Sequence, residues 1–173
     1  MRRLWFSLVG LMVPLRLTSQ APTVPPSPIP VPVATLTAGM GNSMGWFGFQ
    51  GERYFAQGRA SVFGGLGYTP SVQTYDPSGL TFAAGLRGYT SGFKNRGFAE
   101  AAVCQVATVS DPYEARRLYG PCLQAGYQFA TRGGFTLAVS GGWGWALGGV
   151  PSGSRSGQLL VGLGFGYTWR RRT

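Results

Sequence analysis

The residue types that enzymes use for proton transfer are scarce in this chain. Its 173 residues include five acidic residues, two cysteines and no histidine. Histidine is the usual general base and the commonest protein metal ligand, so its absence leaves only carboxylate pairs for such chemistry. Asp111 and Glu114 flank a predicted turn, where an Asp-Pro sequence is common for local geometry alone. We therefore expect no enzymatic activity, no metal site and no cofactor.

Four charged residues occur at alternate positions of predicted strands, on the face whose other residues are mostly small or polar: Glu52, Arg59, Arg87 and Glu100. If the segments 80–90 and 98–108 pair about a centre near residues 93 and 94, Arg87 lies opposite Glu100. Charges enclosed in a narrow interior must neutralise one another, so pairing is expected. We interpret the four as a polar cluster that fills the interior of a barrel. A polar pathway or a proton-linked site is the alternative.

The two cysteines, Cys104 and Cys122, occupy mirror positions about Tyr113 and share the inward phase. Cross-strand neighbours at such positions lie within reach of a disulfide bond. Two cysteines in an exported protein also favour oxidation. Because no CxxC spacing is present, the bridge would pin a hairpin and would not catalyse redox chemistry.

The elements that position these residues are long β-strands. Large apolar residues recur at every second position in two C-terminal segments: Phe135, Leu137, Val139, Trp143, Trp145, Leu147, and then Leu159, Val161, Leu163, Phe165, Tyr167, Trp169. A period of two predicts strands whose side chains point alternately to opposite faces. Weaker alternation predicts six earlier strands at about 34–41, 44–56, 59–69, 80–90, 98–108 and 118–130. The sequence thus predicts an all-β, eight-stranded antiparallel up-and-down barrel.

The connections alternate in character, with one unexpectedly tight turn at Asn42-Ser43. Short glycine-bearing turns near 57–58, 92–97 and 131–134 alternate with longer loops at 70–79, 110–117 and 148–157. Outer-membrane barrels have short periplasmic turns and longer extracellular loops, and with eight strands both chain ends lie on the short-turn side.

The composition indicates which face of the barrel is inside. Charged residues make up 12% of the chain and aromatic residues 14%, whereas soluble domains carry about 25% charged residues. An eight-stranded barrel has too little interior volume for the apolar face. We therefore expect the apolar face to meet lipid in a transmembrane barrel, with aromatic girdles formed by Tyr68, Tyr127, Trp143, Trp145, Tyr167 and Trp169. The alternative, a soluble lipocalin-like binder, would need the opposite facing.

The N-terminal residues predict export. Residues 1–20 combine a basic start, an apolar stretch and small residues near Ser19 to Ala21, which is typical of a signal peptide. Residues 21–33 hold six prolines and predict an extended spacer, with a ligand for a proline-recognising module as the alternative. The barrel domain is expected over 34–173.

Three segments resemble small outer-membrane β-barrel families of the OmpA/OmpX-like or "outer membrane protein beta-barrel" type: Val62 to Tyr68, Gly126 to Phe129 and Gly162 to Trp169. The resemblance covers about residues 34–170. It implies a porin-like membrane scaffold shared by many functions, and an assembly signal at Gly164, Tyr167 and Trp169 that the outer-membrane assembly machinery would read. The tail Arg170 to Thr173 departs from the pattern, since that signal usually ends at the aromatic residue.

The net charge of +10 includes three arginines of the signal segment, and the remaining cations lie at turns and at the C-terminus. They form no stripe with interleaved aromatic residues, so we do not expect nucleic-acid binding.

The expected function is a structural or surface-interaction role in the cell outer membrane, with lipid and an extracellular partner contacted by the loops. The alternative is a narrow channel for small solutes or ions, suggested by inward glycines at Gly142, Gly144, Gly162, Gly164 and Gly166.

Overall fold

The computed structural model describes residues 31–41, 44–71, 78–90, 95–109, 116–148 and 157–171. The predicted signal peptide, most of the predicted spacer, and the acidic residues Asp76, Asp111 and Glu114 lie outside these ranges. The first strand begins at Val31, two residues before the predicted end of the spacer. Pro32 is compatible with this position because it lies at the start of a strand, where a missing N–H is tolerated.

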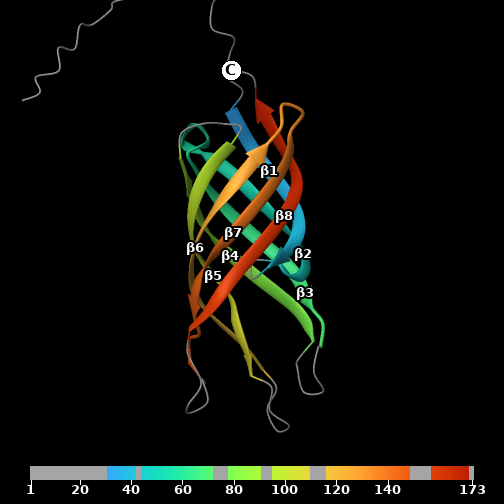
Figure 1. Ribbon diagram of the computed structural model, residues 1–173, viewed down its shortest axis with the longest axis vertical. Coiled ribbons are helices and arrows are strands. Elements are labelled where there is room, and N and C mark those ends of the chain that lie inside the picture. The colour runs from blue at the N-terminus through green and yellow to red at the C-terminus, as the bar shows by residue number, and fades with distance from the viewer. Residues whose placement is uncertain are drawn as a thin grey trace, which may run out of the picture.

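Eight strands make up nearly all of the described chain (Figure 1). They are β1 Val31–Gly41, β2 Gly45–Phe55, β3 Ala60–Thr69, β4 Gly79–Tyr89, β5 Asn95–Val109, β6 Arg116–Ala130, β7 Phe135–Trp145 and β8 Gly157–Arg171. A short 3-10 helix, η1 Ala56–Gly58, joins β2 to β3. Each strand pairs antiparallel with its neighbours, and β1 pairs with β8. The predicted eight-stranded up-and-down barrel is confirmed.

The facing of the side chains follows the period of two in the sequence. In β3, Ser61 and Phe63 are buried, whereas Val62 and Leu66 are exposed. In β8, Leu160 and Thr168 point inward, and the large residues between them in the other phase point outward. All six aromatic residues of the expected girdles are exposed. The barrel therefore has an apolar outer surface and a mixed polar interior, opposite to the arrangement of a soluble barrel.

The two ends of the barrel differ. Figure 1 shows the start of β1, the end of β8, η1 and the β6–β7 turn at the same end, which we call the turn end. The opposite end, called the loop end, is where β1, β3, β5 and β7 end and their connections to the next strands begin. The first of these is the shortest, since Gly41 at the end of β1 already pairs with Gly45 at the start of β2. Both glycines have positive φ, a conformation that favours glycine.

The wall of the barrel is uneven at the loop end. β1 stops at the Gly41–Gly162 pair, so Gly157–Val161 of β8 extends beyond the last residue of β1. The β5–β6 pair continues to Val109 and Arg116, although β4–β5 pairing reaches only Val103. A short β1–β2 hairpin and a long β5–β6 hairpin thus stand on different sides of the same opening.

Candidate functional site

A buried ion-pair network lies inside the barrel toward its turn end. Arg87 of β4 donates through Nε and Nη2 to Oε2 of Glu100 in β5, at 2.8 and 2.5 Å. Its Nη1 donates to Oε2 of Glu52 in β2 at 3.2 Å. All three side chains are buried. The β4–β5 register places Arg87 directly opposite Glu100, as the sequence predicted.

Glu52 is the centre of a second set of contacts. Its Oε2 also accepts a hydrogen bond from the Tyr54 hydroxyl at 3.1 Å, and its Oε1 accepts from the hydroxyls of Ser61 and Tyr89. Including Arg87, four donors surround one carboxylate. A buried carboxylate satisfied in this way is held in one orientation, which suits a structural role.

Arg96 was missed as an interior residue. The sequence placed it among the cations at turns, but it is only 2% exposed. Its Nε donates to Oε1 of Gln128 at 2.7 Å, its Nη1 donates to the carbonyl of Gly58 at 3.0 Å, and its guanidinium lies 3.7 Å from the Tyr89 ring centroid. The sequence feature that could have predicted this position is the spacing of four residues between Arg96 and Glu100. Because β5 begins at Asn95, both residues lie in the strand and their side chains point to the same face.

The predicted interior position of Arg59 is wrong. Arg59 is exposed in the turn after η1, and β3 begins only at Ala60. The reason is local, because Ala56 and Gln57 both adopt positive φ and interrupt the strand alternation before Arg59 is reached. The interior still contains two carboxylates and two guanidinium groups among the described residues, since Arg96 takes the place expected for Arg59.

Aromatic and hydroxyl groups complete the polar layer. The Arg87 guanidinium lies between the rings of Phe98 and Phe63, 4.3 and 4.9 Å from their centroids. Thr35 links β1 to β8 through the Thr168 hydroxyl at 2.8 Å, and Thr168 bonds Thr136 of β7 at 2.6 Å. These contacts connect strands that are distant in sequence, including the pair that closes the barrel.

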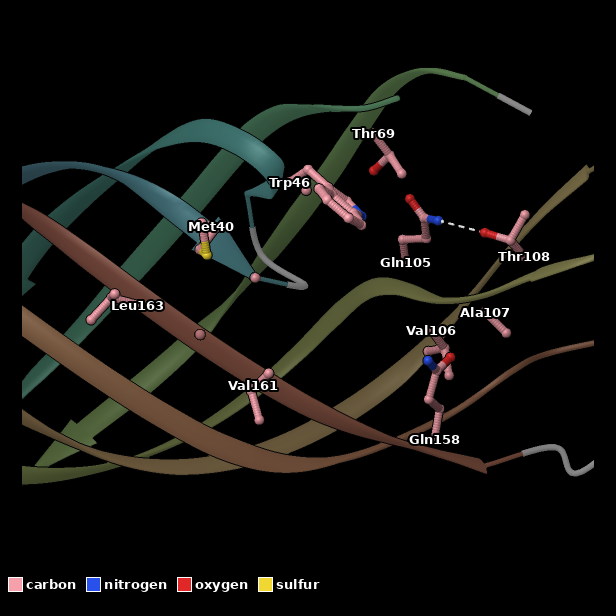
Figure 2. Close-up of a pocket in the computed structure, with 13 residues that line it drawn as sticks. Met40, Trp46, Thr69, Gln105, Val106, Ala107, Thr108, Gln158, Val161 and Leu163 are labelled. Carbon is pink, nitrogen blue, oxygen red and sulfur yellow. Dashed lines mark hydrogen bonds between the residues drawn. The ribbon is translucent and has the colours of Figure 1, made fainter. Parts of the chain in front are cut away.

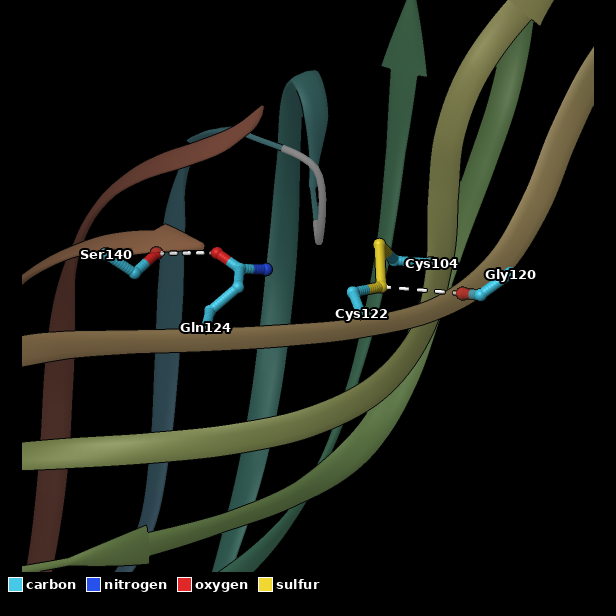
Figure 3. The surroundings of a disulfide bond; sticks show 5 residues. All are labelled: Cys104, Gly120, Cys122, Gln124 and Ser140. Carbon is cyan, nitrogen blue, oxygen red and sulfur yellow. Dashed lines mark hydrogen bonds between the residues drawn. A yellow bond between two sulfur atoms is a disulfide. The ribbon is translucent and has the colours of Figure 1, made fainter. Parts of the chain in front are cut away.

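An apolar layer lies next along the barrel axis, toward the loop end. Its buried members are Ala83, Cys104, Val106, Cys122 and Leu160. Cys104 and Cys122 form a disulfide bond, as Figure 3 shows. Gln124 is near the bridge on β6, and its Oε1 accepts a hydrogen bond from Ser140 at 3.1 Å (Figure 3).

The register around the disulfide differs from the predicted one. Cys104 pairs with Gly120 and Cys122 with Ala102, so the cysteines are diagonal neighbours and not direct partners. The hairpin is centred on residue 112 here, one residue before Tyr113. An irregularity between Gln105 and Ala107 adds a residue to β5, which accounts for one of the two residues by which the partner of Cys104 moves from Cys122 to Gly120. The Cα atoms are 6.4 Å apart, still within the range a disulfide bridges.

The inward glycines have close neighbours where a Cβ atom would lie. A Cβ atom added to Gly166 would collide with the carbonyl oxygen of Leu36, and one added to Gly142 would collide with that of Leu123. At Gly144 it would lie 3.0 Å from Val106 and 3.1 Å from Leu160. At Gly162 it would lie 2.6 Å from the Ser140 hydroxyl, and at Gly164 3.3 Å from Met44. These glycines permit close packing of neighbouring groups.

A cavity of about 690 Å³ lies at the loop end. It is framed by the β1–β2 hairpin, β5 and β8 (Figure 2). The residues that line it are Met40, Gly41, Gly45, Trp46, Thr69, Gln105, Val106, Ala107, Thr108, Gln158, Val161, Gly162 and Leu163. The sequence did not predict this cavity, because the relative lengths of two hairpins at one end of a barrel cannot be read from a local pattern.

The residues of the expected assembly signal all lie on β8. Gly164 is buried, whereas Tyr167 and Trp169 are exposed and their rings meet edge to face at 5.3 Å between centroids. β8 is one of the two strands at the seam where the barrel closes, because it pairs with β1.

Within the described ranges, neither a metal-binding cluster nor a helical membrane span is found. No group of three or more acidic, cysteine or histidine residues there could hold a metal ion. No helix among those residues is long and apolar enough to cross a membrane.

No protein-family model matches the chain, and no curated protein or solved structure matches it either. The functional argument therefore depends on the barrel and its side chains.

Proposed function

We propose that this chain is a non-enzymatic barrel of a cell outer membrane, with a structural or surface-interaction role and a lumen filled by side chains. The observation that carries the proposal is the inverted facing of the barrel. Its outer surface exposes large apolar residues on every strand, among them Phe49, Leu66, Leu80, Val161 and Phe165. Monomeric soluble proteins rarely expose contiguous apolar patches above a few hundred Å².

The distribution of charge supports a membrane location. Both acidic residues of the described chain, Glu52 and Glu100, are buried in the lumen. Several arginines lie on the outer surface or at the turn end, and no acidic residue of the described ranges accompanies them on that surface. They are Arg53, Arg59, Arg132, Arg170 and Arg171. Such a set of cations suits the phosphate groups of the nearer leaflet. The exposed tyrosines and tryptophans fit the interfacial girdles of outer-membrane barrels.

A filled lumen favours a scaffold over the alternative of a narrow channel. The ion-pair network and the apolar layer follow each other along the barrel axis, and both consist of buried side chains. Ligand or partner recognition would then fall to the loop end, and the assembly machinery would read the end of β8. No acid–base or nucleophilic constellation is present among the described residues to support enzymatic activity.

Membrane fractionation followed by gel electrophoresis with and without boiling tests this proposal. We expect the mature chain to resist carbonate extraction and to change mobility only when heated, because closed outer-membrane barrels remain folded in detergent. A freely soluble, unshifted protein would contradict it.

Planar-bilayer recording then separates scaffold from channel: we expect no discrete conductance steps, and reproducible steps would favour the channel.

A further inference from the structure

The loop-end cavity opens through the side of the barrel wall. β8 contributes to its lining both Val161 and Leu163, which point outward, and Gln158 and Gly162, which belong to the inward phase. Side chains of the two phases point to opposite faces of a sheet, so both can line one cavity only where it passes around a strand edge. That edge is the part of β8 that extends past the end of β1.

The cavity is therefore continuous with the outer surface. Met40, Val161 and Leu163 line the cavity and are also exposed in the outward phase of their strands. Trp46 lines the cavity as well and is exposed at the open end. Its floor is closed by Val106, which packs with Leu160 and the disulfide in the apolar layer. A molecule in the surrounding lipid could enter sideways, but the floor separates it from the ion-pair network.

The polar side chains of the lining gather at one end, where Val106 and Ala107 also lie, and the other end is apolar. Figure 2 shows Thr69, Gln105, Thr108 and Gln158 toward the loop end, and Met40 and Leu163 toward the body of the barrel. Among the residues that the structure describes, no charged side chain belongs to the lining. Amides and hydroxyls can bond an uncharged headgroup, whereas an ionic headgroup would find no described counter-charge within the lining.

We propose that this cavity binds a single-chain amphiphile with an uncharged polar headgroup, taken from the outer leaflet over the β1–β2 hairpin. The alkyl chain lies against Met40, Val161 and Leu163, and the headgroup lies near Gln105, Thr108 and Gln158. The volume of about 690 Å³ is in the range of ordinary ligand sites, about 300–1,000 Å³. The inference rests on the proposed membrane facing, since only then is the apolar mouth in contact with lipid.

The test is photolabelling of the full barrel in phosphatidylcholine vesicles with a diazirine analogue of hexadecanol. We expect saturable labelling at residues 105–108 and around Trp46, mapped by mass spectrometry. Excess unlabelled hexadecanol should abolish it, and hexadecyl sulfate, which has the same chain and a charged headgroup, should compete much less well. Labelling that rises linearly with probe and is spread over the whole outer surface would overturn the proposal, as would equal competition by the sulfate.

Two tryptophan variants on β5 provide a matched comparison. Ala107→Trp places a ring in the lining, and Ala101→Trp places the same ring on the outer surface, away from the cavity. Excluding about two methylene groups from the cavity should weaken labelling roughly tenfold in Ala107→Trp and leave Ala101→Trp unchanged. Equal labelling of the two variants would contradict the assignment.

Folding is checked by the heat shift of each variant. If Ala107→Trp does not fold, Trp46→Ala, which enlarges the mouth, should change the labelling pattern at residues 105–108, and an unchanged pattern would count against the site. Failure of the proposed function can be distinguished from failure of the binding site. In the first case the wild-type chain would not insert into vesicles, and its electrophoretic mobility would not change on heating.

Discussion

At the scale of single residues, the interior is held by one guanidinium between two carboxylates. Arg87 bonds both Glu52 and Glu100, and each partner comes from a different strand. Burying such charges costs several kcal/mol per ion unless all are paired, so the pairing serves mainly to avoid an uncompensated charge. The network therefore specifies which strands lie side by side more than it adds stability.

Arg87→Met should destabilise the barrel by about 3–5 kcal/mol, because two buried carboxylates lose their cation. The double variant Arg87→Met/Glu100→Gln should recover part of this loss, since one of the two charges is also removed. Urea unfolding in detergent measures both. Arg59→Met is the control, and it should stay within about 0.5 kcal/mol because Arg59 is an exposed turn residue. Equal effects of the Arg87 and Arg59 substitutions would refute the network's role.

The disulfide restrains the β5–β6 hairpin through a loop of 18 residues. Replacing both cysteines by alanine should cost about 3 kcal/mol, mainly by freeing the unfolded chain. Unfolding midpoints with and without reductant should differ for the wild type and coincide for the double variant. A wild type insensitive to reductant, under conditions that reduce the bond, would count against this contribution.

At the scale of elements, neighbouring strands approach each other closely where glycine is present. Gly166 on β8 faces the backbone of β1, with the Leu36 carbonyl oxygen in the place of a Cβ atom. Gly51 on β2 has nothing within 4 Å of that place. The two glycines therefore serve different purposes, although the sequence gives no means of telling them apart.

Gly166→Ala should lower the temperature of the heat shift, with a loss of about 1–3 kcal/mol, because β1 and β8 must separate at the closing seam. Gly51→Ala should be neutral within about 0.5 kcal/mol, since its methyl group enters open space. The pair is compared by electrophoresis over a temperature series. A more harmful effect at Gly51 would show that the seam is not the sensitive element.

At the scale of the whole molecule, the apolar exterior is the feature that supports the proposed lipid surroundings. Phe165 lies midway along β8, is exposed, and pairs with Ala38 and Leu137 on its two sides. Its position would be near the centre of a bilayer if the barrel spans one. Substitutions there report on the surroundings of the barrel.

Phe165→Lys should cost about 2–4 kcal/mol more than Phe165→Ala in a bilayer, because lysine is strongly disfavoured at the midplane on a lipid face. The alanine variant controls for the lost ring. Reversible unfolding in lipid vesicles provides the difference. If the lysine variant proved as stable as the alanine variant, the outer surface would not be facing lipid.

The sequence by itself determined the barrel and the direction of its faces. Strict alternation in segments such as Phe135–Trp145 fixes which side chains share a face, whatever the distant contacts are. The short separation of β4 and β5 along the chain then limits their register, and with it the Arg87–Glu100 pair. These features depend on residues that are close in the chain, so a local pattern is sufficient to predict them.

Three features were decided only by the tertiary structure. They are the identity of the second interior cation, the register of the two cysteines, and the place at the loop end where β1 stops short of β8. Positive φ at Ala56 and Gln57 removes Arg59 from the interior, and an earlier start of β5 brings Arg96 into it. The β5–β6 register, which pairs Cys104 with Gly120, makes the two cysteines diagonal neighbours and not direct partners. The cavity exists because hairpins of unequal length meet around one opening. Strand ends, bulges and relative hairpin lengths depend on pairing between segments, which alternation within a segment does not encode.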